Sequence, residues 1–544
     1  MYNLWYKNAV IYCLDVDAFM DSDGDGVGDF QGLTDRLDHI EALGCDTIWL
    51  LPFYPSPDRD NGYDITDYYA VDPRLGNLGH FVEFALAAKD RGLKVMVDLV
   101  VNHTSIDHPW FQMSREGHPK YRDWYLWKDE KPADAEKGVI FPGVQKSTWT
   151  LDRKRKAYYF HRFYKHQADL NIANPAVREE IERIIGFWLA LGVSGFRVDA
   201  VPFMLEDLKG KGDGQSPFGY LAEIRRFLSW RQAEAILLAE ANIPMEEAGD
   251  YFGNDDRLNV IFNFPLNQKL FLALARREAT PVRDFLKALP EIPETAQWAT
   301  FLRNHDEIDL GRLEDEERKD VFAAFGPEKS MQIYDRGIRR RLAAMLGGDE
   351  RRIEVAFSLM LSLPGTPVIW YGDELGMGDN LDLPERNAVR TPMQWSAKRS
   401  GGFSTAKPED CVREPVTDGP FGYAHVNADA QRIDPTSLFA TVQRLIRARR
   451  SCPEIGWGTA EVLDVDGPSV IGLRYTWRGN TLVTLHNLSD EPQTVEITPL
   501  IEGCDVRPVL RAAIDIDRSG DGMTLKLGAY GYQWFRLDPP AEEG

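Results

Sequence analysis

Short apolar runs recur along the first three quarters of the chain, and each is followed by a polar turn and a longer amphipathic stretch. The runs are almost continuously hydrophobic and rich in β-branched residues, which is typical of parallel strands buried on both faces. The eight runs are AVIYCL from Ala9, TIWLLPF from Thr47, LKVMVDLV from Leu93, SGFRVDA from Ser194, AILLAE from Ala235, LNVIFNF from Leu258, WATFLRNHD from Trp298 and TPVIWYGDE from Thr366.

The stretches between these runs have the periodicity of helices. Between Glu180 and Leu191, apolar residues recur at i, i+3, i+4, i+7 and i+8, which places them on one helix face. Asn174 followed by Pro175 predicts the N-cap and the first turn of this helix. Eight alternating units predict an α/β fold, a (β/α)8 TIM barrel formed by residues 1–101 and 170–452.

Two segments depart from this alternation. Residues 102–169 are rich in Trp, Tyr, Lys and His and carry no strand–helix repeat. We predict an inserted subdomain there, after the third strand, where the loops of such barrels form the active site. From about Pro453, short apolar runs alternate with turn residues, which predicts an antiparallel β-sandwich domain over residues 453–544.

Composition limits the classes of partner and the compartment. The net charge of the 544-residue chain is −22, which disfavours nucleic acid and anionic membranes but is compatible with a neutral sugar. No apolar run approaches the roughly 18 residues of a membrane span, and the N-terminal segment does not resemble a signal peptide. Five scattered cysteines without a CxxC pair favour a reducing, cytoplasmic location. A homo-oligomer is neither predicted nor excluded.

Three predicted strands end in a carboxylate. Asp199 ends SGFRVD, Glu240 ends AILLAE and Asp306 ends FLRNHD, where barrel enzymes carry their chemistry. One such residue could be an ordinary loop anion, but three like charges in one cavity cost stability unless they act on a substrate. Paired carboxylates suit glycoside chemistry, in which one attacks the anomeric carbon and the other protonates the leaving oxygen. Arg197 faces the same side of the strand as Asp199, either to keep it ionised or as a simple ion-pair anchor.

The segments VDLVVNH, GFRVDA, LLAEAN and FLRNHDE resemble, in this order, the four short conserved regions of the α-amylase superfamily, glycoside hydrolase family thirteen. The resemblance implies a retaining enzyme for α-glucosides. It implies that Asp199 is the nucleophile, that Glu240 is the general acid/base and that Asp306 stabilises the transition state. It also implies three sugar-binding residues, each of which has an ordinary structural role as the alternative: His103, Arg197 and His305.

A pocket with a blind end is implied by further matches. The segment DNGYD from Asp60 resembles the loop of exo-acting members, in which Tyr63 stacks on the terminal glucose and Asp60 binds its far hydroxyls. A packed core aromatic is the alternative for Tyr63. The resemblance implies that Arg390, in NAVRTPMQW, pairs with Asp60 and closes the pocket, and that Phe163 and Gln167 belong to its wall.

The stretch DSDGDGVGD resembles the first part of an EF-hand loop, with oxygen ligands at positions 1, 3, 5, 7 and 9 and Gly26 at position 6. Gly32 replaces the glutamate of position 12, so the motif is incomplete, and a polar turn is the alternative. The predicted ligands of this structural Ca²⁺ are Asp21, Asp23, Asp25, the Val27 carbonyl and Asp29. The resemblance implies a second Ca²⁺ at Asn102, Asp169 and Glu206, and no organic cofactor.

Within the superfamily, NHDE with Glu307, GIRRRLAAML, SLPGTPVIWYGDELGMGDN, RTPMQWS and VNADAQ resemble the trehalose synthase subfamily most closely. This implies isomerisation of maltose to trehalose with some hydrolysis, with Glu307 beside the second sugar under a lid. Two acceptor-side loops depart from the subfamily, including Ile243-Pro244 where Gln-Trp is usual. An exo-acting α-glucosidase or transglucosidase on maltose, sucrose or short α-glucans is therefore the alternative, and a non-catalytic sugar-binding scaffold is a remote one.

Overall fold

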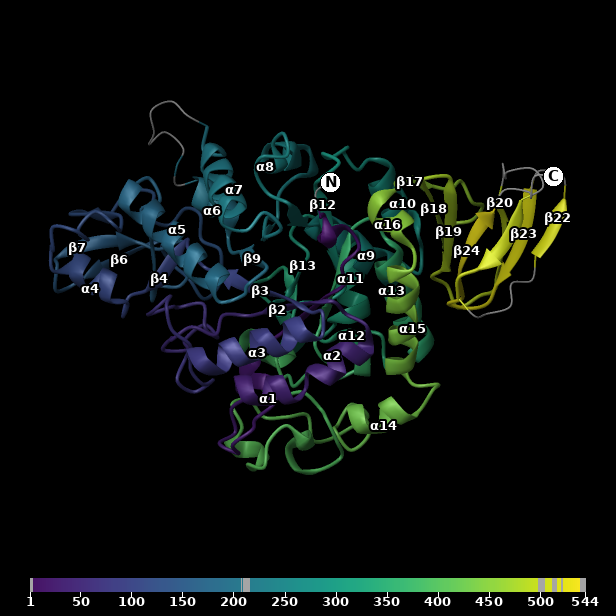
Figure 1. The fold of residues 1–544 in the computed structure, drawn as a ribbon, viewed down its shortest axis with the longest axis horizontal. Helices are drawn as coiled ribbons and strands as arrows, with labels where there is room; N and C mark the ends of the chain where they lie inside the picture. Colours follow the sequence, from purple (N-terminus) through teal and green to yellow (C-terminus); the bar gives the residue numbers. More distant parts are fainter. Residues whose placement is uncertain are drawn as a thin grey trace.

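Eight parallel strands close into a barrel in the order β1-β16-β12-β11-β10-β9-β3-β2, with helices around it (Figure 1). The structure, a computed structural model, describes residues 3–206, 208, 216–497, 504–510, 516–519 and 522–538. All eight apolar runs supply the predicted strands, so the barrel is confirmed. Its strands are β1 (Ile11–Leu14), β2 (Thr47–Leu50), β3 (Lys94–Leu99), β9 (Gly195–Val198), β10 (Ile236–Ala239), β11 (Val260–Phe262), β12 (Gln297–Phe301) and β16 (Thr366–Trp370).

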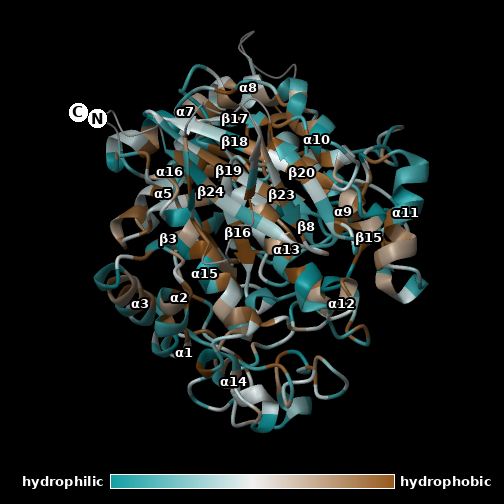
Figure 2. Cartoon of the chain, turned by 90° about the vertical axis from the view of Figure 1, so that its right-hand side faces the viewer, coloured by the Kyte–Doolittle hydropathy of each residue, from teal (hydrophilic) through white to brown (hydrophobic). Residues whose placement is uncertain are grey.

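The helices bury their apolar faces against the barrel, and Figure 2 shows hydrophobic colour concentrated inside the molecule. In α5 the Asn174 side chain accepts a hydrogen bond from the Ala176 amide and Pro175 is the first helical residue, as predicted. The helices with their bounds are α1 (Phe30–Asp35), α2 (Leu37–Leu43), α3 (Leu78–Asp90), α5 (Pro175–Ala190), α6 (Val201–Glu206), α7 (Gly219–Arg231), α8 (Ala248–Phe252), α9 (Phe264–Arg276), α10 (Thr280–Lys287), α11 (Asp315–Phe325), α12 (Leu342–Met345), α13 (Glu350–Ser362), α14 (Ala428–Ile433), α15 (Leu438–Arg450) and α16 (Pro453–Trp457).

The insertion between β3 and α5 has its own small sheets. Its elements are β4 (His103–Ser105), α4 (Pro109–Arg115), β5 (Trp127–Lys128), β6 (Trp149–Asp152), β7 (Ala157–Phe160) and β8 (Gln167–Asp169). Strand β4 pairs antiparallel with β8, with His103 opposite Asp169, so the two ends of the insertion are fastened to each other at the barrel. The helix α4 was not expected, because two turns are too short for a visible periodicity.

The C-terminal region forms two antiparallel sheets, β17-β18-β19-β24-β21 and β20-β23-β22, at the right of Figure 1. Their facing side chains, among them Val483, Val495 and Leu525, form a separate apolar cluster. The strands are β17 (Thr459–Val462), β18 (Val470–Trp477), β19 (Asn480–Asn487), β20 (Gln493–Ile497), β21 (Asp505–Pro508), β22 (Ile516–Ser519), β23 (Gly522–Leu527) and β24 (Tyr532–Asp538). In the described part of the chain, no helix is long and apolar enough to span a bilayer.

Candidate active site

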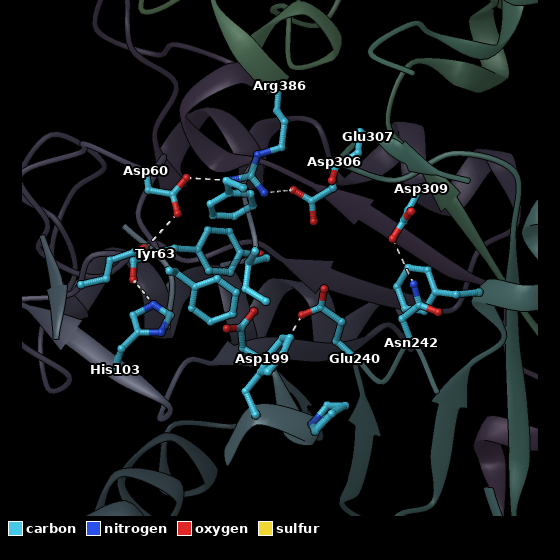
Figure 3. Close-up of a pocket in the computed structure, with 18 of the residues that line it drawn as sticks. Asp60, Tyr63, His103, Asp199, Glu240, Asn242, Asp306, Glu307, Asp309 and Arg386 are labelled. Atoms are coloured by element: carbon cyan, nitrogen blue, oxygen red, sulfur yellow. Dashed lines mark hydrogen bonds and ion pairs between the residues drawn. The ribbon is translucent and has the colours of Figure 1, made fainter. Parts of the chain in front are cut away.

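The carboxylates that follow three barrel strands converge on one cavity of about 320 Å³. Asp199 directly follows β9 and Glu240 directly follows β10, whereas β12 ends at Phe301, so Asp306 lies in the loop after this strand rather than at its last position. Figure 3 shows the three side chains directed into this central cavity. Its volume lies at the small end of the range for small-molecule sites, and most of the exposed wall is apolar with a few convergent polar groups.

One buried guanidinium connects two of these carboxylates. Arg197 Nη1 lies 2.5 Å from Asp199 Oδ1, and Nη2 lies 2.8 Å from Glu240 Oε2. Arg197 Nη1 also lies 2.6 Å from Asp98 on β3, whose other oxygen accepts a hydrogen bond from the Trp49 indole. Asp98 was not among the predicted site residues, although it stands in the VDLVVNH segment. Arg197 therefore holds the carboxylates of Asp199 and Glu240 in a fixed orientation relative to each other.

Burial has the largest effect on the pKa values of Asp199 and Glu240. Burial raises the pKa of Asp199 to about 6, against the opposing charge of Arg197. It raises the pKa of Glu240 to about 7, because desolvation and the charge of Asp199 outweigh Arg197. Asp199 and Glu240 bind the two terminal nitrogens of one guanidinium, Arg197, at 2.5 and 2.8 Å, so the two carboxylates lie side by side in the cavity. Retaining glycoside enzymes use such a pair as nucleophile and general acid.

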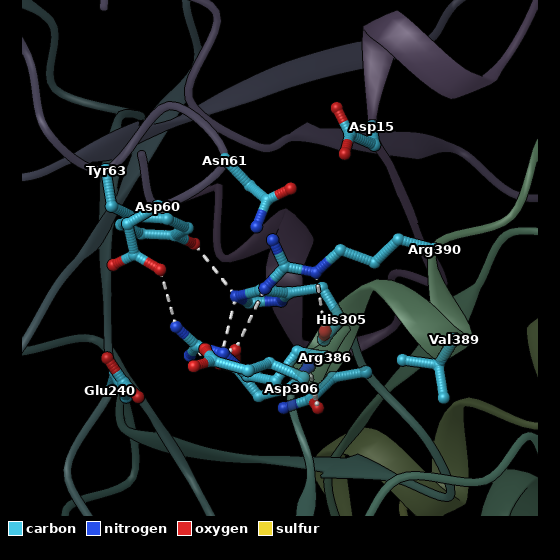
Figure 4. Close-up of polar contacts among 12 residues, drawn as sticks. Asp15, Asp60, Asn61, Tyr63, Glu240, His305, Asp306, Arg386, Val389 and Arg390 are labelled. Atoms are coloured by element: carbon cyan, nitrogen blue, oxygen red, sulfur yellow. Dashed lines mark hydrogen bonds and ion pairs between the residues drawn. The ribbon is translucent and has the colours of Figure 1, made fainter. Parts of the chain in front are cut away.

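The far end of the cavity is closed by Arg386, which the sequence patterns did not single out. Arg386 Nη2 donates to Asp60 Oδ1 at 2.7 Å and Nη1 donates to Asp306 Oδ1 at 2.6 Å, as Figure 4 shows. Gln167 donates to the other Asp60 oxygen at 2.8 Å. Although burial opposes it, the positive charge of Arg386 and the contact with His305 hold the pKa of Asp306 well below its usual range.

The prediction that Arg390 pairs with Asp60 is wrong. Arg390 is fully buried and binds the His305 carbonyl at 2.8 Å and Asp306 Oδ1 at 3.1 Å. The two arginines are separated by one turn of a 3-10 helix, η6 (Glu385–Val389). The earlier arginine reaches the Asp60 loop, whereas the later one supports Asp306 from behind.

The remaining predicted sugar-binding residues form two layers. Tyr63, His103, Phe163, Gln167 and Glu307 line the cavity. Arg197, His305 and Arg390 lie behind that lining. The Tyr63 ring is parallel to the His305 ring at 5.7 Å, and its hydroxyl lies 2.8 Å from His305 Nε2. Tyr63 is therefore a packed aromatic that also presents a surface to the cavity. Burial lowers the pKa of His305 to about 3 and that of His103 to about 4, so both are neutral near pH 7.

Residues from three distant segments pack together at the side of the cavity that Phe141 lines. Phe141 of the insertion stacks on Tyr164 and lies 4.8 Å from the ring of Tyr334. Tyr334 belongs to the hairpin of β14 (Gln332–Ile333) and β15 (Gly337–Ile338). The Tyr164 hydroxyl donates to Glu385 at 2.8 Å and lies 3.0 Å from the Tyr334 hydroxyl. These contacts join the insertion to the loops after β12 and β16.

The structure brings some of the predicted ligands of the calcium loop close to one another. One carboxylate oxygen each of Asp21, Asp23 and Asp29 lies within 4.8 Å of the others. Asp25 lies outside this group and accepts a hydrogen bond from the Val27 amide at 2.8 Å. Of the four predicted carboxylate ligands, the structure therefore brings three together.

The second predicted calcium site is also partly assembled. Asn102 Nδ2 lies 3.2 Å from Asp169 Oδ2, and the buried Asn102 Oδ1 has no hydrogen-bond partner. An unpaired buried acceptor beside a carboxylate fits a cation. Glu206, however, forms an ion pair with Arg162 at 3.2 Å. The arginine brings a positive charge to the place where the third ligand was predicted.

A closed (β/α)8 barrel with buried carboxylates at the ends of its fourth, fifth and seventh strands defines an enzyme of the α-glycoside-processing class. The family description "Alpha amylase, catalytic domain" matches residues 13–324 and 334–458, and the chain belongs to this family. A second description, "Sucrose hydrolase-like, C-terminal domain", matches residues 479–536. Both matches agree with the predicted superfamily and with the two-part architecture.

Several known proteins are similar over nearly the whole chain. A trehalose synthase of Thermus thermophilus is 43% identical over 98% of this chain, which spans 56% of that protein. A trehalose synthase/amylase of Mycobacterium tuberculosis is 41% identical over 98% of this chain and 90% of its own length. The solved structure of a trehalulose synthase from Pseudomonas mesoacidophila has a TM-score of 0.76 at 27% identity, and covers 98% of this chain and 99% of its own.

Proposed function

We propose that the protein isomerises maltose to trehalose by retaining α-glucosyl transfer, with some hydrolysis. The observation that carries this proposal is a cavity that contains the Asp199–Glu240 pair and is closed at one end by the Asp60–Arg386–Asp306 contacts. A blind end admits only a terminal glucose. In the proposed reaction, the joined segments of Phe141, Tyr164 and Tyr334 cover the second sugar and keep the released glucose in place for a second attack. The names of the relatives most similar in sequence support the same reaction.

The proposed mechanism has two displacements. Asp199 attacks C1 of the terminal glucose while Glu240 protonates the glycosidic oxygen, which gives a glucosyl ester and free glucose. The free glucose turns, and its anomeric hydroxyl attacks C1 of the ester while Glu240 takes the proton. Asp306, kept ionised by Arg386, stabilises the positive charge of the transition state. Arg197 holds both reacting carboxylates in place throughout.

The cavity favours neutral sugars over phosphorylated ones. The lining guanidiniums, Arg336 and Arg386, both have carboxylate partners, Asp309 for the former and Asp60 and Asp306 for the latter. A phosphate would have to compete with these buried partners and would meet several carboxylates. We therefore propose a neutral disaccharide as the substrate. A cytoplasmic location, supported by five free cysteines, is part of the same proposal.

Incubation with maltose followed by chromatography of the products tests the proposal. We expect trehalose as the main product and glucose as a minor one. Glucose alone would contradict the isomerisation and favour the exo-acting α-glucosidase. Unchanged maltose would contradict the proposed donor, and sucrose and short α-glucans would then be tested in the same assay.

The pH dependence follows from the two raised pKa values. Asp199 must be ionised to attack, so kcat/KM should fall as the pH drops below about 6. Glu240 must be protonated in the free enzyme, so kcat/KM should also fall as the pH rises above about 7. We expect a narrow bell-shaped profile for maltose, with limbs that belong to the coupled pair rather than to either residue alone. A profile that stays flat from pH 5 to 9 would contradict this assignment.

Arg386→Ala is expected to lower kcat/KM for maltose by about 10²–10³-fold, because Asp60 and Asp306 would lose a shared buried cation. The measurement is steady-state kinetics with a melting curve for each variant. Arg183→Ala, which removes an exposed arginine from α5, is the matched control. An Arg386 variant with control-like kinetics would remove this residue from the donor end of the site.

We also propose that the loop from Asp21 to Asp29 binds a structural Ca²⁺, and that a second ion binds at Asn102 and Asp169. At 100 times its Kd, an ion adds about 2.7 kcal/mol to stability, so EDTA should lower Tm by a few degrees and Ca²⁺ should restore it. Asp23→Asn should weaken this response, whereas Asp25→Asn should retain it, since only Asp23 belongs to the carboxylate group. An EDTA-insensitive Tm would contradict both sites.

A further inference from the structure

A carboxylate on the acceptor side of the cavity has no role in the mechanism above. Asp309 lines the cavity, and Figure 3 shows it on the side opposite Asp60. It ends the short strand β13 (Ile308–Asp309), two residues after Glu307. Side chains alternate along an extended segment, so Glu307 and Asp309 face the same side while Ile308 is buried in the core.

The Asp309 carboxylate is held in one orientation. Oδ2 accepts a hydrogen bond from Asn242 Nδ2 at 3.1 Å, and Oδ1 accepts one from the Gly311 amide at 2.7 Å. Arg336 Nε lies 3.4 Å from Oδ1. Asn242 is itself fixed, because Arg312 Nε donates to its Oδ1 at 2.7 Å. A carboxylate has about four lone-pair sites, so two remain for a ligand.

The position of this pair suits the second sugar of a disaccharide. Both oxygens of Asp60 are already bound at the donor end, by Arg386 and Gln167. Asn242 follows Glu240 by two residues, and Glu240, Asn242 and Asp309 all line the cavity on the side away from Asp60, as Figure 3 shows. Phe264 also lines the cavity and offers an apolar surface to a sugar ring.

Glu307 complements Asp309 on the same wall. Its Oε2 is buried and has no hydrogen-bond partner. Desolvation, with the charges of Asp306 and Asp309, raises the pKa of Glu307 to about 7, against the charge of Arg386. The wall therefore offers Glu307, which can donate a hydrogen bond when it is protonated, and Asp309, which can accept one, and together these match the hydroxyls of a neutral sugar.

We propose that Asp309 binds hydroxyls of the acceptor glucose and orients it so that the anomeric hydroxyl, rather than another hydroxyl or water, attacks the glucosyl ester of Asp199. This inference rests on the proposed isomerisation. In the step, the bond from C1 to the Asp199 oxygen breaks, a bond from C1 to the anomeric oxygen of glucose forms, and the hydroxyl proton passes to Glu240. Asn242 and Arg336 are positioning residues that keep Asp309 oriented.

The test separates the donor half of the reaction from the acceptor half. With α-glucosyl fluoride as donor, fluoride release without added glucose reports the donor site. Isotopically labelled glucose as acceptor reports trehalose, maltose and hydrolysis separately. For Asp309→Ala we expect fluoride release within about threefold of the wild type. We expect a KM for acceptor glucose raised about tenfold or more, as for lost hydrogen bonds to a charged group, and a lower ratio of trehalose to hydrolysis.

Matched variants keep the test decisive. Asp309→Asn preserves the shape of the side chain and should show the same change in ratio if Asp309→Ala fails to fold, whereas Asp309→Glu should restore part of the ratio. Asp315→Asn removes an exposed charge at the start of α11 and should behave as the wild type. If Asp309→Ala and Asp309→Asn both keep the wild-type KM and product ratio, this inference is overturned, whereas the proposed isomerisation is unaffected. A wild type that makes no trehalose from these substrates would contradict the proposed function.

Discussion

Replacing Asp199 with asparagine is expected to lower kcat for maltose by at least about 10⁴-fold, since an amide cannot form the glucosyl ester. The shape of the side chain is preserved, and Arg197 keeps its contacts with Asp98 and Glu240. Steady-state kinetics on maltose, together with a search for the glucosyl-enzyme by mass spectrometry, are the measurements. No adduct should form on the variant.

The same replacement should not destabilise the fold. Burial raises the folded-state pKa of Asp199 above its ordinary value, so the folded protein binds a proton more tightly than the unfolded chain does. The free energy of unfolding therefore falls as the pH rises from the ordinary pKa of an aspartate to about 6. An asparagine is neutral throughout this range and avoids the loss. We expect Tm of Asp199→Asn at pH 7 to equal or exceed that of the wild type. If Asp199→Asn is inactive because it is unfolded, the nucleophile is identified from the glucosyl adduct of the wild type. A folded and active Asp199→Asn would contradict the assignment.

Glu240→Gln is expected to lower kcat/KM for maltose by about 10³–10⁴-fold, because the leaving glucose can no longer take a proton. α-Glucosyl fluoride needs no proton for departure, so glucosylation by this donor should fall far less. Azide attacks the β-linked glucosyl ester without a base, so it should rescue turnover and give the α-glucosyl azide. Rates with both donors, with and without azide, separate the acid/base from a merely structural glutamate.

The control for this variant lies in the same loop. Glu246 belongs to the exposed 3-10 helix η3 (Met245–Glu247), and Glu246→Gln should leave both donors unaffected. The alkaline limb of the pH profile should also disappear in Glu240→Gln, because that limb reports the raised pKa of Glu240. Equal losses with maltose and the fluoride donor, without rescue by azide, would contradict the general acid/base assignment.

The barrel could be predicted because its strands are buried on both faces. Such strands, like the runs that contain Val97 and Leu238, are nearly uniform in hydrophobicity, and this signal depends little on distant contacts. The carboxylates at the strand ends follow from the same signal, since the end of each run is visible in the sequence. The strand boundaries in the second half of the C-terminal region are harder to predict from the sequence. Only a short turn, Gly528–Gly531, separates its strands β23 and β24, so the apolar pattern does not mark the boundary between them.

The donor-end arginine could not be predicted because it depends on loop conformation. Arg386 and Arg390 are both arginines in one polar segment, and only the turn of η6 decides which of them reaches the Asp60 loop. The acceptor wall is equally hidden from the sequence, because Asn242 follows β10 whereas Asp309 and Arg336 come from distant parts of the segment after β12. Local periodicity contains no information on such contacts, which are set by tertiary packing.

A crossover experiment tests the isomerisation most directly. The enzyme is incubated with a mixture of fully ¹³C-labelled and unlabelled maltose, and the masses of the trehalose molecules are measured. Since the proposed mechanism keeps the released glucose in the cavity, we expect fully labelled and unlabelled trehalose, with half-labelled molecules rare. Trehalose in which half-labelled molecules reach the proportion for free exchange, or glucose without any trehalose, would contradict intramolecular transfer in this cavity.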